Sequence, residues 1–377
     1  MKKGWQTKTL GELCRIRTGK KDVNEGNPDG EFPFFTCAAE HTFSDNYSFD
    51  TEALLIAGNG DVGKVSYYNG KFEAYQRTYV LSDFTEVLPR YLFLILDGKL
   101  KDTVSKQKLG NTMPYIKVGM LTDFHLPVPP LAEQQRIVGL LDEAFEGLAT
   151  AKANAEKNLQ NARALFESHL QSVFTQRGPG WVEKRLGGVV TRLTNGFVGP
   201  TRNIYHESGV PYLLARHVKN NRLLFDGRTF ISDEFNRKNK KSMLKAGDVL
   251  LVQSGHIGHS AVVTKEHEGH NCHAMIVITA VEGAFLGPFL SLFFNSSGMK
   301  QKFQEIRSGS TVPHLTCGEV RELMIPMPDL ATQRRVVDHS QELDEETQRL
   351  ARLYERKLAA LEALKKSLLH QAFTGEL

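Results

Sequence analysis

The sequence predicts an α+β protein built as an internal twofold repeat, with two mixed α/β domains separated by two long helices that form an antiparallel coiled coil. The first observation is a repeated passage: LPVPPLAEQQRIV at 126–138 returns as IPMPDLATQRRVV at 325–337, 199 positions later. Short apolar runs bounded by Gly, Asn and Pro precede each passage, which is typical of strands and turns. A long Pro-free segment with apolar residues at helical spacing follows each passage.

The two domains share further passages in the same order. GWQTKTLGELCRIRTGK at 4–20 matches GWVEKRLGGVVTRLTNG at 180–196, and ALLIAGNGDVGKVSYY at 53–68 matches DVLLVQSGHIGHSAVV at 248–263. KLGNTMPYIKVGMLTDFHLPVP at 108–129 matches RSGSTVPHLTCGEVRELMIPMP at 307–328 without a gap. We therefore predict four segments: a first domain at 1–128, a first helix at 129–177, a second domain at 178–327 and a second helix at 328–377.

A glycine motif in the first domain has two interpretations. Gly58-x-Gly60-x-x-Gly63 follows the apolar run ALLIA and is similar to a dinucleotide-binding fingerprint, which requires a helix after the glycines. The residues that follow are KVSYYNGKFEAY, which predict a β-hairpin with Asn69-Gly70 at its turn. The matching passage of the second domain keeps only the last two glycines. We expect turn-forming glycines and no cofactor on this chain.

The two helical segments carry apolar residues at alternating steps of three and four over about six heptads, which predicts a coiled-coil seam. Proline pairs before each segment fix an extended approach to the helix. Parallel and antiparallel pairing both bury the seam. We expect the antiparallel form, because the second domain lies between the helices in sequence and can return the chain. The seam positions are Ile137, Leu141, Ala144, Leu148, Ala151, Ala155, Leu159, Ala162, Phe166, Leu170 and Val173, then Val336, Leu343, Leu350, Tyr354, Leu361, Leu364 and Leu368.

Composition limits the setting in which the protein works. The net charge is only +4, so attraction to a polyanion must come from local patches. The four cysteines have no paired spacing, and the sequence shows neither a signal-like start nor a run of about 18 apolar residues. We expect a cytoplasmic protein without a membrane segment.

In the order and duplication of these motifs, the chain resembles the specificity subunit of type I restriction-modification enzymes. The resemblance rests on the Trp-x4-Leu-Gly start of each domain, the Gly-Asn-Thr-x-Pro and Gly-Ser-Thr-x-Pro turns, the two helix entries and the FTGEL ending. It implies two target-recognition domains that each read one part of a gapped double-stranded DNA target. It also implies that the paired helices hold two methyltransferase subunits and set the gap, and that restriction subunits join the assembly.

The resemblance further implies that the chain is not an enzyme, and that S-adenosylmethionine binds the partner methyltransferase. The sequence has no Asn-Pro-Pro-aromatic or Asp-Pro-Pro-aromatic tetrapeptide of the kind found in amino-methyltransferases. A protein-binding scaffold that self-associates through its coiled coil is an alternative. Salt separates the two, because binding through phosphates weakens steeply as salt rises. A stand-alone methyltransferase is a third option, and it would bind S-adenosylmethionine as the isolated chain.

The run HIGHSAVVTKEHEGHNCH at 256–273 raises the question of a metal. Zinc would need four such ligands that converge at fixed spacings. The first domain has none of them at the matched positions, so the shared fold does not need a metal. We expect no metal site, and a hairpin whose exposed side chains vary with the partner that they touch.

Two matched basic stretches are candidates for phosphate contacts, because binding to the DNA backbone depends on charge neutralisation. Both end in a Gly-polar-Thr turn whose donors could also reach phosphates. A solvated helix face is the plainer interpretation, but recurrence in both domains favours DNA. The candidates are Lys101, Lys108, Asn111 and Thr112 in the first domain, and Lys300, Lys302, Arg307, Ser310 and Thr311 in the second.

Other polar residues are candidates for reading base edges, where Arg pairs with guanine and Asn or Gln with adenine. Their identities differ between the domains while the apolar frame around them agrees, which predicts two unlike reading surfaces on one scaffold. The candidates are Lys20, Lys21, Asn59, Asp61, Gln76 and Arg77 in the first domain, and Asn195, Arg216, His217, Gln253, Ser254, His256 and His273 in the second.

Overall fold

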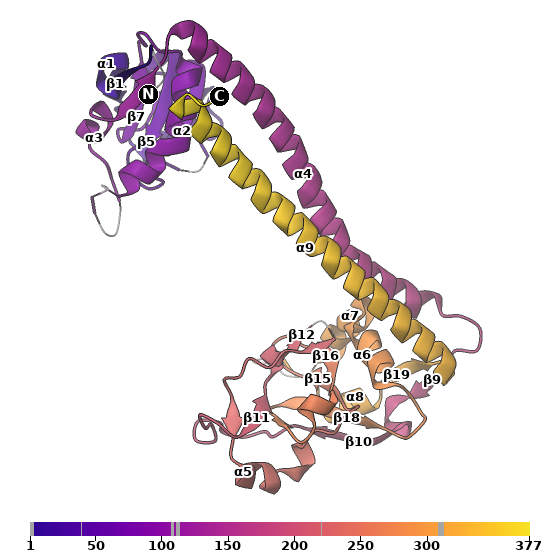
Figure 1. The fold of residues 1–377 in the computed structure, drawn as a ribbon. Coiled ribbons are helices and arrows are strands. Elements are labelled where there is room, and N and C mark those ends of the chain that lie inside the picture. The colour runs from indigo at the N-terminus through magenta and orange to yellow at the C-terminus, as the bar shows by residue number, and fades with distance from the viewer. Residues whose placement is uncertain (1–3, 39, 107–108, 111–113, 220, 308–312) are drawn as a thin grey trace. The chain divides into compact units, whose positions relative to one another are not determined.

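The computed structural model describes residues 4–38, 40–106, 109–110, 114–219, 221–307 and 313–377. The chain divides into two compact units (Figure 1). Unit 1 consists of Met1–Glu156 and Glu355–Leu377, and unit 2 consists of Lys157–Tyr354. Each unit therefore contains one mixed domain together with a part of each long helix.

A six-stranded sheet in the order β2-β7-β5-β6-β3-β4 forms the centre of unit 1. β3 pairs with β6 in parallel, and the other neighbours pair antiparallel. Both faces of β5 are covered, because Leu54 and Ile56 belong to one apolar cluster while Ala53 and Leu55 belong to another. The strands are β2 (Arg15–Thr18), β3 (Phe32–Phe35), β4 (Thr42–Ser44), β5 (Phe49–Ala57), β6 (Val65–Ala74) and β7 (Thr78–Ser82).

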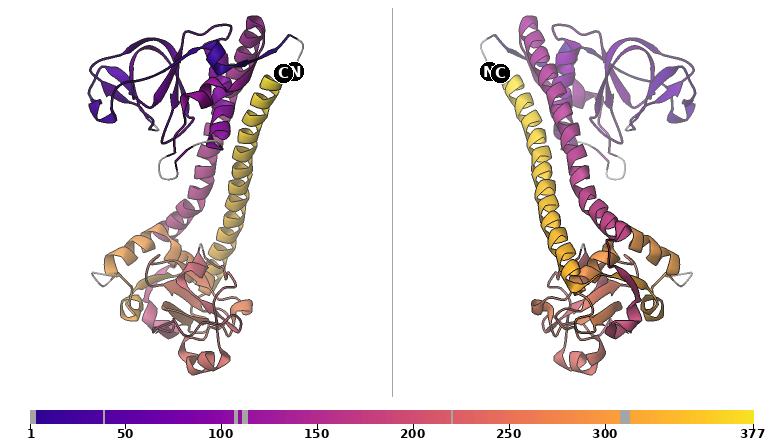
Figure 2. Two further views of the ribbon diagram at one scale, coloured as in Figure 1. Left: turned by 90° about the vertical axis from the view of Figure 1, so that its left-hand side faces the viewer. Right: turned by 90° about the vertical axis from the view of Figure 1, so that its right-hand side faces the viewer.

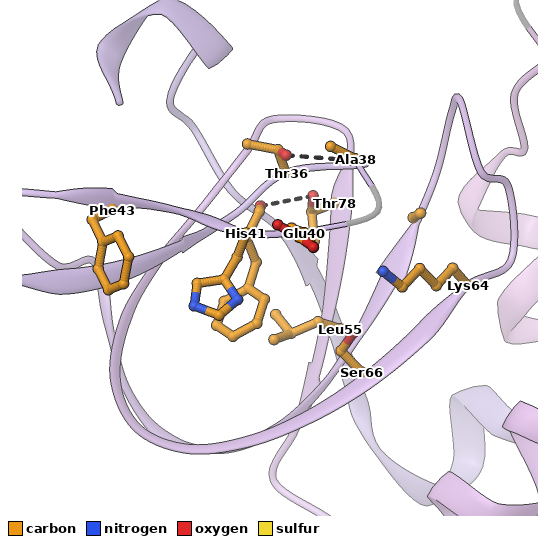
Figure 3. A pocket seen from close by; sticks show the side chains of 11 residues that line it. Thr36, Ala38, Glu40, His41, Phe43, Leu55, Lys64, Ser66 and Thr78 are labelled. Carbon is orange, nitrogen blue, oxygen red and sulfur yellow. Dashed lines mark hydrogen bonds between the residues drawn. The ribbon is translucent and has the colours of Figure 1, made fainter. Parts of the chain in front are cut away.

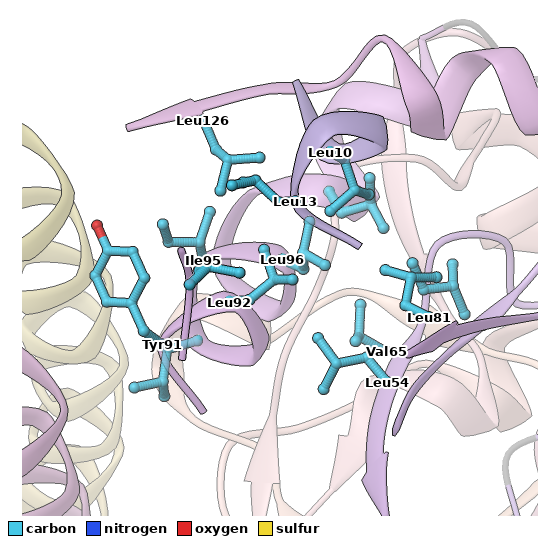
Figure 4. Packing of buried hydrophobic residues seen from close by; sticks show 14 of the residues in the cluster. Leu10, Leu13, Leu54, Val65, Leu81, Tyr91, Leu92, Ile95, Leu96 and Leu126 are labelled. Carbon is cyan, nitrogen blue, oxygen red and sulfur yellow. The ribbon is translucent and has the colours of Figure 1, made fainter. Parts of the chain in front are cut away.

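The helix α2 (Pro89–Ser105) covers one face of this sheet. Figure 4 shows Leu92 and Leu96 of α2 packed toward Leu54 and Leu81 of the strands. A two-stranded ribbon of β1 (Gln6–Thr9) and β8 (His125–Val128), with the short helices α1 (Leu10–Leu13), η1 (Val23–Glu25) and α3 (Val118–Thr122), completes the domain. β8 leads directly into the first long helix.

Unit 2 repeats this arrangement with interruptions. The sheet β10-β18-β15-β16 corresponds to β2-β7-β5-β6, and the ribbon β9-β19 corresponds to β1-β8. The long strand β6 has two counterparts, β16 and β17, because the histidine-rich segment divides it. The strands are β9 (Val182–Arg185), β10 (Val190–Asn195), β11 (Val210–Leu213), β12 (Val218–Lys219), β13 (Arg222–Leu223), β14 (Phe230–Ile231), β15 (Val249–Val252), β16 (Ser260–Val262), β17 (Asn271–Cys272), β18 (Met275–Ala280) and β19 (Met324–Met327).

The counterpart of α2 in unit 2 is also divided. α6 (Gly287–Asn295) ends at Ser296, whose hydroxyl accepts a hydrogen bond from the Met299 amide and so caps α7 (Ser297–Ile306). A side-chain cap of this kind allows a new helix to begin at once. The remaining short helices are η2 (Leu186–Gly188), η3 (Ala215–His217), α5 (Asp233–Lys238), η4 (Lys240–Ser242), η5 (Lys265–His267) and α8 (Cys317–Arg321).

The two long helices are α4 (Leu131–Gln176) and α9 (Leu330–Thr374), and they pair antiparallel within each unit (Figure 2). In unit 1, Lys152 Nζ lies 2.7 Å from Glu362 Oε1, and Arg136 donates to the Leu377 carbonyl. In unit 2, His169 Nε2 lies 3.1 Å from Ser340 Oγ. The predicted antiparallel coiled coil is confirmed. Among the described residues, no helix is long and apolar enough to cross a bilayer.

A buried glutamine near the start of each long helix ties that helix to its domain. Gln134 is fully buried, and its Nε2 donates to the carbonyls of Pro129 (2.8 Å) and Glu86 (2.9 Å). Its Oε1 accepts from the Leu88 amide at 2.7 Å, just before α2 begins. Gln333 makes the equivalent bonds to the Pro328 carbonyl and the Leu286 amide, both at 2.9 Å. These two bonds explain why the repeated passage keeps a glutamine at this position.

One predicted turn is wrong. Asn69 and Gly70 do not form a hairpin turn, because β6 runs through them from Val65 to Ala74 and pairs with β5, with Asn69 opposite Glu52 and Gly70 opposite Thr51. β5 is long enough to pair along nearly all of β6, and this pairing overrides the local turn preference of Asn-Gly. The turn lies instead at 58–64. There Gly60 and Gly63 have φ of +64° and +81°, which glycine adopts without strain.

Candidate nucleic-acid interface

The end of β5 brings several of the predicted base-reading residues of unit 1 together. The Gly58 amide donates to the Arg77 carbonyl at 3.0 Å, and the Ile116 amide donates to the Gly58 carbonyl at 2.9 Å. The next residue, Asn59, forms an isolated β-bridge with Tyr115. These bonds bring Asn59 close to Gln76 and Arg77, although they come from two separate segments of the chain. Gln76 and Arg77 are exposed, whereas Asn59 is buried.

Lys21 and Gln76 lie at the edge of the same region. The Gln76 amide donates to the Lys21 carbonyl at 2.9 Å, and Gln76 Nε2 donates to Asp22 Oδ2 at 3.1 Å. Lys21 Nζ pairs with Glu25 Oε2 at 2.8 Å, and this hydrogen bond raises the pKa of Lys21. The side chain of Lys20 is exposed. Glu25 partly neutralises the charge of Lys21 in the free protein. The hydrogen bond to Asp22 fixes the position of the Gln76 side chain.

Lys101 is held by an acidic partner in unit 1. Its Nζ lies 2.5 Å from Oδ1 of Asp61, which belongs to the glycine turn. The matched residues of unit 2 are Lys300 and His256, so the acidic partner is replaced by an imidazole. No ion pair of Lys300 is found within the described part of unit 2. The two units therefore present different charge at matched positions.

Positive charge gathers around Lys300. It lines an open pocket of about 450 Å³ together with Lys219 and Arg222, and Arg222 Nη2 pairs with Asp344 Oδ2 at 2.7 Å. The pKa of His259 is lowered mainly by burial, and next by the charges of Lys300 and other neighbours. Because a clustered positive charge attracts phosphate, this face of unit 2 is suited to a nucleic-acid backbone.

The predicted base-reading residues of unit 2 also lie near one strand end. Ser254 forms a β-bridge with His314, as Asn59 does with Tyr115 in unit 1. Cys317 Sγ donates to Asn195 Oδ1 at 3.2 Å. The ring nitrogen Nδ1 of His273 lies 3.3 Å from the Tyr212 hydroxyl, and burial lowers the pKa of His273. Like positions thus carry unlike side chains in the two units.

Arg216 and His217 occupy different environments. Arg216 Nε pairs with Asp226 Oδ2 at 3.2 Å and remains half exposed. His217 is 1% exposed, with Nδ1 accepting from the Leu214 amide and Nε2 3.1 Å from Asp226 Oδ1. Both ring nitrogens of His217 are engaged, and burial lowers its pKa. In this conformation His217 supports Asp226 and, through it, Arg216, and it does not reach the surface.

The remaining phosphate candidates that the structure describes, Lys302 and Arg307, lie on α7 and directly after it. Lys302 Nζ pairs with Glu305 Oε2 at 3.3 Å, and Arg307 Nη1 donates to Gln304 Oε1 at 2.5 Å. Both residues are exposed, Lys302 on α7 and Arg307 at its C-terminal cap. Lys108, Asn111, Thr112, Ser310 and Thr311 lie outside the described residues.

The histidine-rich segment is spread over several elements. His267 Nδ1 lies 2.7 Å from Thr264 Oγ1, and His267 itself is buried. The rings of His256 and His259 have centroids 5.7 Å apart. The described residues contain no group of three or more His, Cys, Asp or Glu side chains that could hold a metal ion.

Two of the pockets of unit 1 lie on opposite sides of the segment 77–79. The first, of about 430 Å³, has His41 and Phe43 on one flank and Lys64 on the other (Figure 3). The second, of about 320 Å³, is lined by Gly58, Gln76, Arg77, Tyr79 and Ile116. Only the second contains predicted base-reading residues.

Comparison with known proteins identifies the family. The family described as type I restriction modification DNA specificity domain matches residues 2–159 and 179–356, once for each repeat. The chain belongs to this family. It is a DNA-recognition subunit of a type I restriction-modification system.

Individual relatives agree with this assignment. The EcoDI specificity subunit of Escherichia coli is 39% identical over 153 residues, which cover 41% of this chain and 34% of that protein. The EcoBI specificity subunit of the same species is 21% identical over 403 residues, 97% of this chain and 80% of that protein. The similarity to the EcoDI subunit thus spans about a third of that relative, whereas the similarity to the EcoBI subunit spans most of both chains.

Two solved structures share the fold. A chain from a study of complex assembly and conformational transition in the type I R-M system has a TM-score of 0.78 at 19% identity, covering 100% of this chain and 99% of that one. The HsdS subunit of Thermoanaerobacter tengcongensis has a TM-score of 0.62 at 18% identity, covering 100% and 98%. At these identities the likeness concerns the fold alone.

Two residues at the interface were not among the sequence candidates. Tyr115 and His314 occupy matched places in the passages MPYIKVG and VPHLTCG and contact Asn59 and Ser254. Like the other candidates, they are unlike side chains with a hydrogen-bonding group at matched places of a shared apolar frame. The third shared passage, which differs at this position, carries the signal that points to them.

Proposed function

We propose that this specificity subunit recognises a gapped double-stranded DNA target, with each unit reading one part of it. The observation that carries this proposal is that the two units hold different side chains at matched positions of the same strand framework. Asn59 with Tyr115 in unit 1 corresponds to Ser254 with His314 in unit 2. Because direct readout depends on the donors and acceptors presented to the major groove, equal frames with different side chains suit two different half-sites.

The paired helices are proposed to hold two copies of a methyltransferase subunit, one for each repeat. Restriction subunits would then join the assembly. Adenine methylation with S-adenosylmethionine is assigned to the methyltransferase subunit, and no catalytic residue is assigned to this chain. The assembly would act in the cytoplasm, where its DNA target lies.

The experiment that tests the proposal is competition binding. The subunit, purified with its methyltransferase partner, is incubated with a labelled duplex that contains a gapped site and with unlabelled competitors in which either half is scrambled. We expect both halves to be required, and affinity to fall steeply as salt rises. Equal competition by scrambled and intact duplexes would contradict the proposal.

Charge at the interface offers a second test. Asp61 neutralises Lys101 at 2.5 Å in the free protein. Asp61→Asn would release that lysine to a phosphate, so the salt dependence of binding, as the slope of log affinity against log salt, should steepen by about 0.9. Asp50→Asn removes an exposed carboxylate of β5, outside the proposed interface, and serves as the matched control.

The helix pair is proposed to set the gap between the half-sites. The sequence predicts that seven extra residues near Ala155 preserve the heptad and lengthen the helix by about 10 Å. Because Lys152 of α4 pairs with Glu362 of α9, a matched insertion belongs after Lys152 and before Glu362. We expect the gap in the methylated motif to grow by about three base pairs at 3.4 Å each. An unchanged gap would refute the proposal that the helix pair sets its length.

A further inference from the structure

The strand registers give residue-by-residue equivalence between the two units. In unit 1, Ile56 of β5 lies opposite Tyr79 of β7, and in unit 2, Leu251 of β15 lies opposite Ile276 of β18. Two positions beyond Ile56 is Gly58, and two beyond Leu251 is Gln253. The bonds agree, because the carbonyl of Gly58 accepts from Ile116 and that of Gln253 accepts from Leu315, both at 2.9 Å.

The same registers relate two positions on the neighbouring strands. Two residues before Tyr79 is Arg77, and two before Ile276 is Ala274. Unit 1 therefore has a glycine and an arginine where unit 2 has a glutamine and an alanine. Each unit thus has one large polar side chain in this region. In unit 1 it is Arg77, just before β7, and in unit 2 it is Gln253, just after β15.

In unit 1, packing explains this exchange. A Cβ at Gly58 would lie 2.3 Å from the Arg77 carbonyl and 2.8 Å from the Tyr79 ring, so no side chain fits there. The space beside it is the pocket of about 320 Å³ that Arg77 and Gln76 line. The backbone groups of this pocket are already bonded to one another, and the Tyr79 hydroxyl donates to the Ile116 carbonyl at 2.9 Å.

Arg77 is the free donor of this pocket. Its side chain is exposed, and no hydrogen bond or ion pair of its guanidinium is found in the described part of unit 1. Gln76, by contrast, already donates to Asp22. A guanidinium presents a planar fork of N–H donors, which fits the two acceptors O6 and N7 on the major-groove edge of guanine.

In unit 2, the glutamine has an unmet acceptor. Gln253 is 9% exposed, and its Oε1 is buried without a hydrogen-bond partner among the described residues. A buried acceptor left unsatisfied is unfavourable, so a ligand that satisfies it gains affinity. The amide group of glutamine can accept from N6 and donate to N7 of adenine, and it matches no other base as well.

We propose that each unit reads one base at this equivalent subsite: guanine through Arg77 in unit 1 and adenine through Gln253 in unit 2. The proposal rests on the proposed function, since it names the bases that two residues of the DNA interface recognise. On DNA binding, Gln253 turns its amide outward to the base edge, and Arg77 needs no rearrangement. The same position of the shared fold thus selects guanine in unit 1 and adenine in unit 2.

The test is the methylated motif of variant complexes. The subunit is assembled with its methyltransferase partner and allowed to methylate a random-sequence DNA library, and the modified sites are read by sequencing. Arg77→Gln should abolish the preference for guanine at one position of one half-site. Gln253→Glu should abolish the preference for adenine at one position of the other half-site. The expected loss of discrimination is about 5- to 150-fold at that position, the fold-change for one bidentate pair.

Two kinds of control accompany these variants. Lys71→Gln in unit 1 and Lys265→Gln in unit 2 each remove an exposed positive charge outside the subsite and should leave the motif unchanged. Arg77→Lys keeps the charge but not the fork, so it should relax the same position while it retains most of the affinity. This variant decides the matter if Arg77→Gln proves inactive.

The outcomes separate the inference from the function on which it rests. If the wild-type complex methylates no gapped motif, the proposed function fails. If it methylates one but the Arg77 variants weaken all sites equally, Arg77 contacts phosphate and its assignment is refuted. If the position that relaxes is not guanine for Arg77, or not adenine for Gln253, the assignment of that residue is refuted as well.

Discussion

Replacement of Gln134 by leucine should destabilise unit 1 selectively. The side chain is fully buried and makes three hydrogen bonds, to the carbonyls of Pro129 and Glu86 and from the amide of Leu88. Leucine fills a similar volume but leaves all three backbone groups without their partner. The expected effect therefore comes from hydrogen bonding and not from a cavity.

The magnitude follows from the burial of each bond. The bond to Pro129 is buried, and its loss costs about 1–3 kcal/mol, whereas the two part-buried bonds cost about 0.5–1 kcal/mol each because water can replace them. We expect the free energy of unfolding of unit 1 to fall by about 3 kcal/mol. For a unit of this size, this corresponds to a melting temperature lower by roughly 6–12 °C.

Tryptophan fluorescence can follow each unit separately. The chain has two tryptophans, and Trp5 packs on the core of unit 1 while Trp181 packs on that of unit 2. In a Trp181→Phe background, Trp5 alone reports the unfolding of unit 1. Gln135→Leu is the matched control, because Gln135 is the exposed neighbour on the same helix and its replacement should change stability by less than about 0.5 kcal/mol. If Gln134→Leu and Gln135→Leu melt together, the reasoning is refuted.

Three further predictions concern burial and charge. His169, His217, His259, His270 and His273, all in unit 2, have pKa values lowered chiefly by burial. The folded unit then binds fewer protons than the unfolded chain, so its stability should be complete above pH 6.5 and fall toward pH 5; a constant Trp181 melting midpoint across this range would contradict it. Asp248 is fully buried and pairs with Arg192, so Asp248→Asn should destabilise unit 2 by roughly 3–5 kcal/mol in urea unfolding, whereas the exposed Asp233→Asn should have little effect. Burial raises the pKa of the Cys14 and Cys272 thiols to about 12, so iodoacetamide at pH 8 should modify the partly exposed Cys37 first, as mass spectrometry of the native protein would show; equal rates would count against this.

The long-range organisation could be predicted from the repeated passages and from the helical spacing of apolar residues. The proline pairs end two residues before Leu131 and Leu330, where α4 and α9 begin, and the apolar seam required a partner of equal length. Local details were less predictable. Asn69-Gly70 favours a turn on its own, but a long neighbouring strand pairs across it. Pairing partners distant in sequence decide such cases, and local preference does not show them.

The matched placement of the candidate residues was easier to predict than their surroundings. The repeats align Asn59 with Ser254, and the structure gives both residues an equivalent β-bridge beyond a strand end. Burial is set by the packing of other segments, so sequence alone did not separate the enclosed His217 from its exposed neighbour Arg216. Nor did it show that Asp61 neutralises Lys101, because that ion pair joins a turn to a helix 40 residues later.

The division of the chain also bears on the order of folding during synthesis. Unit 2 is one continuous stretch, whereas the core of unit 1 includes Phe373, whose ring lies 5.7 Å from that of Tyr91. A ribosome therefore releases every residue of the second recognition unit before it has made the last residues of the first. The amino-terminal domain must wait with part of its apolar surface uncovered, and a nascent chain stalled before α9 ends would be a natural substrate for chaperones.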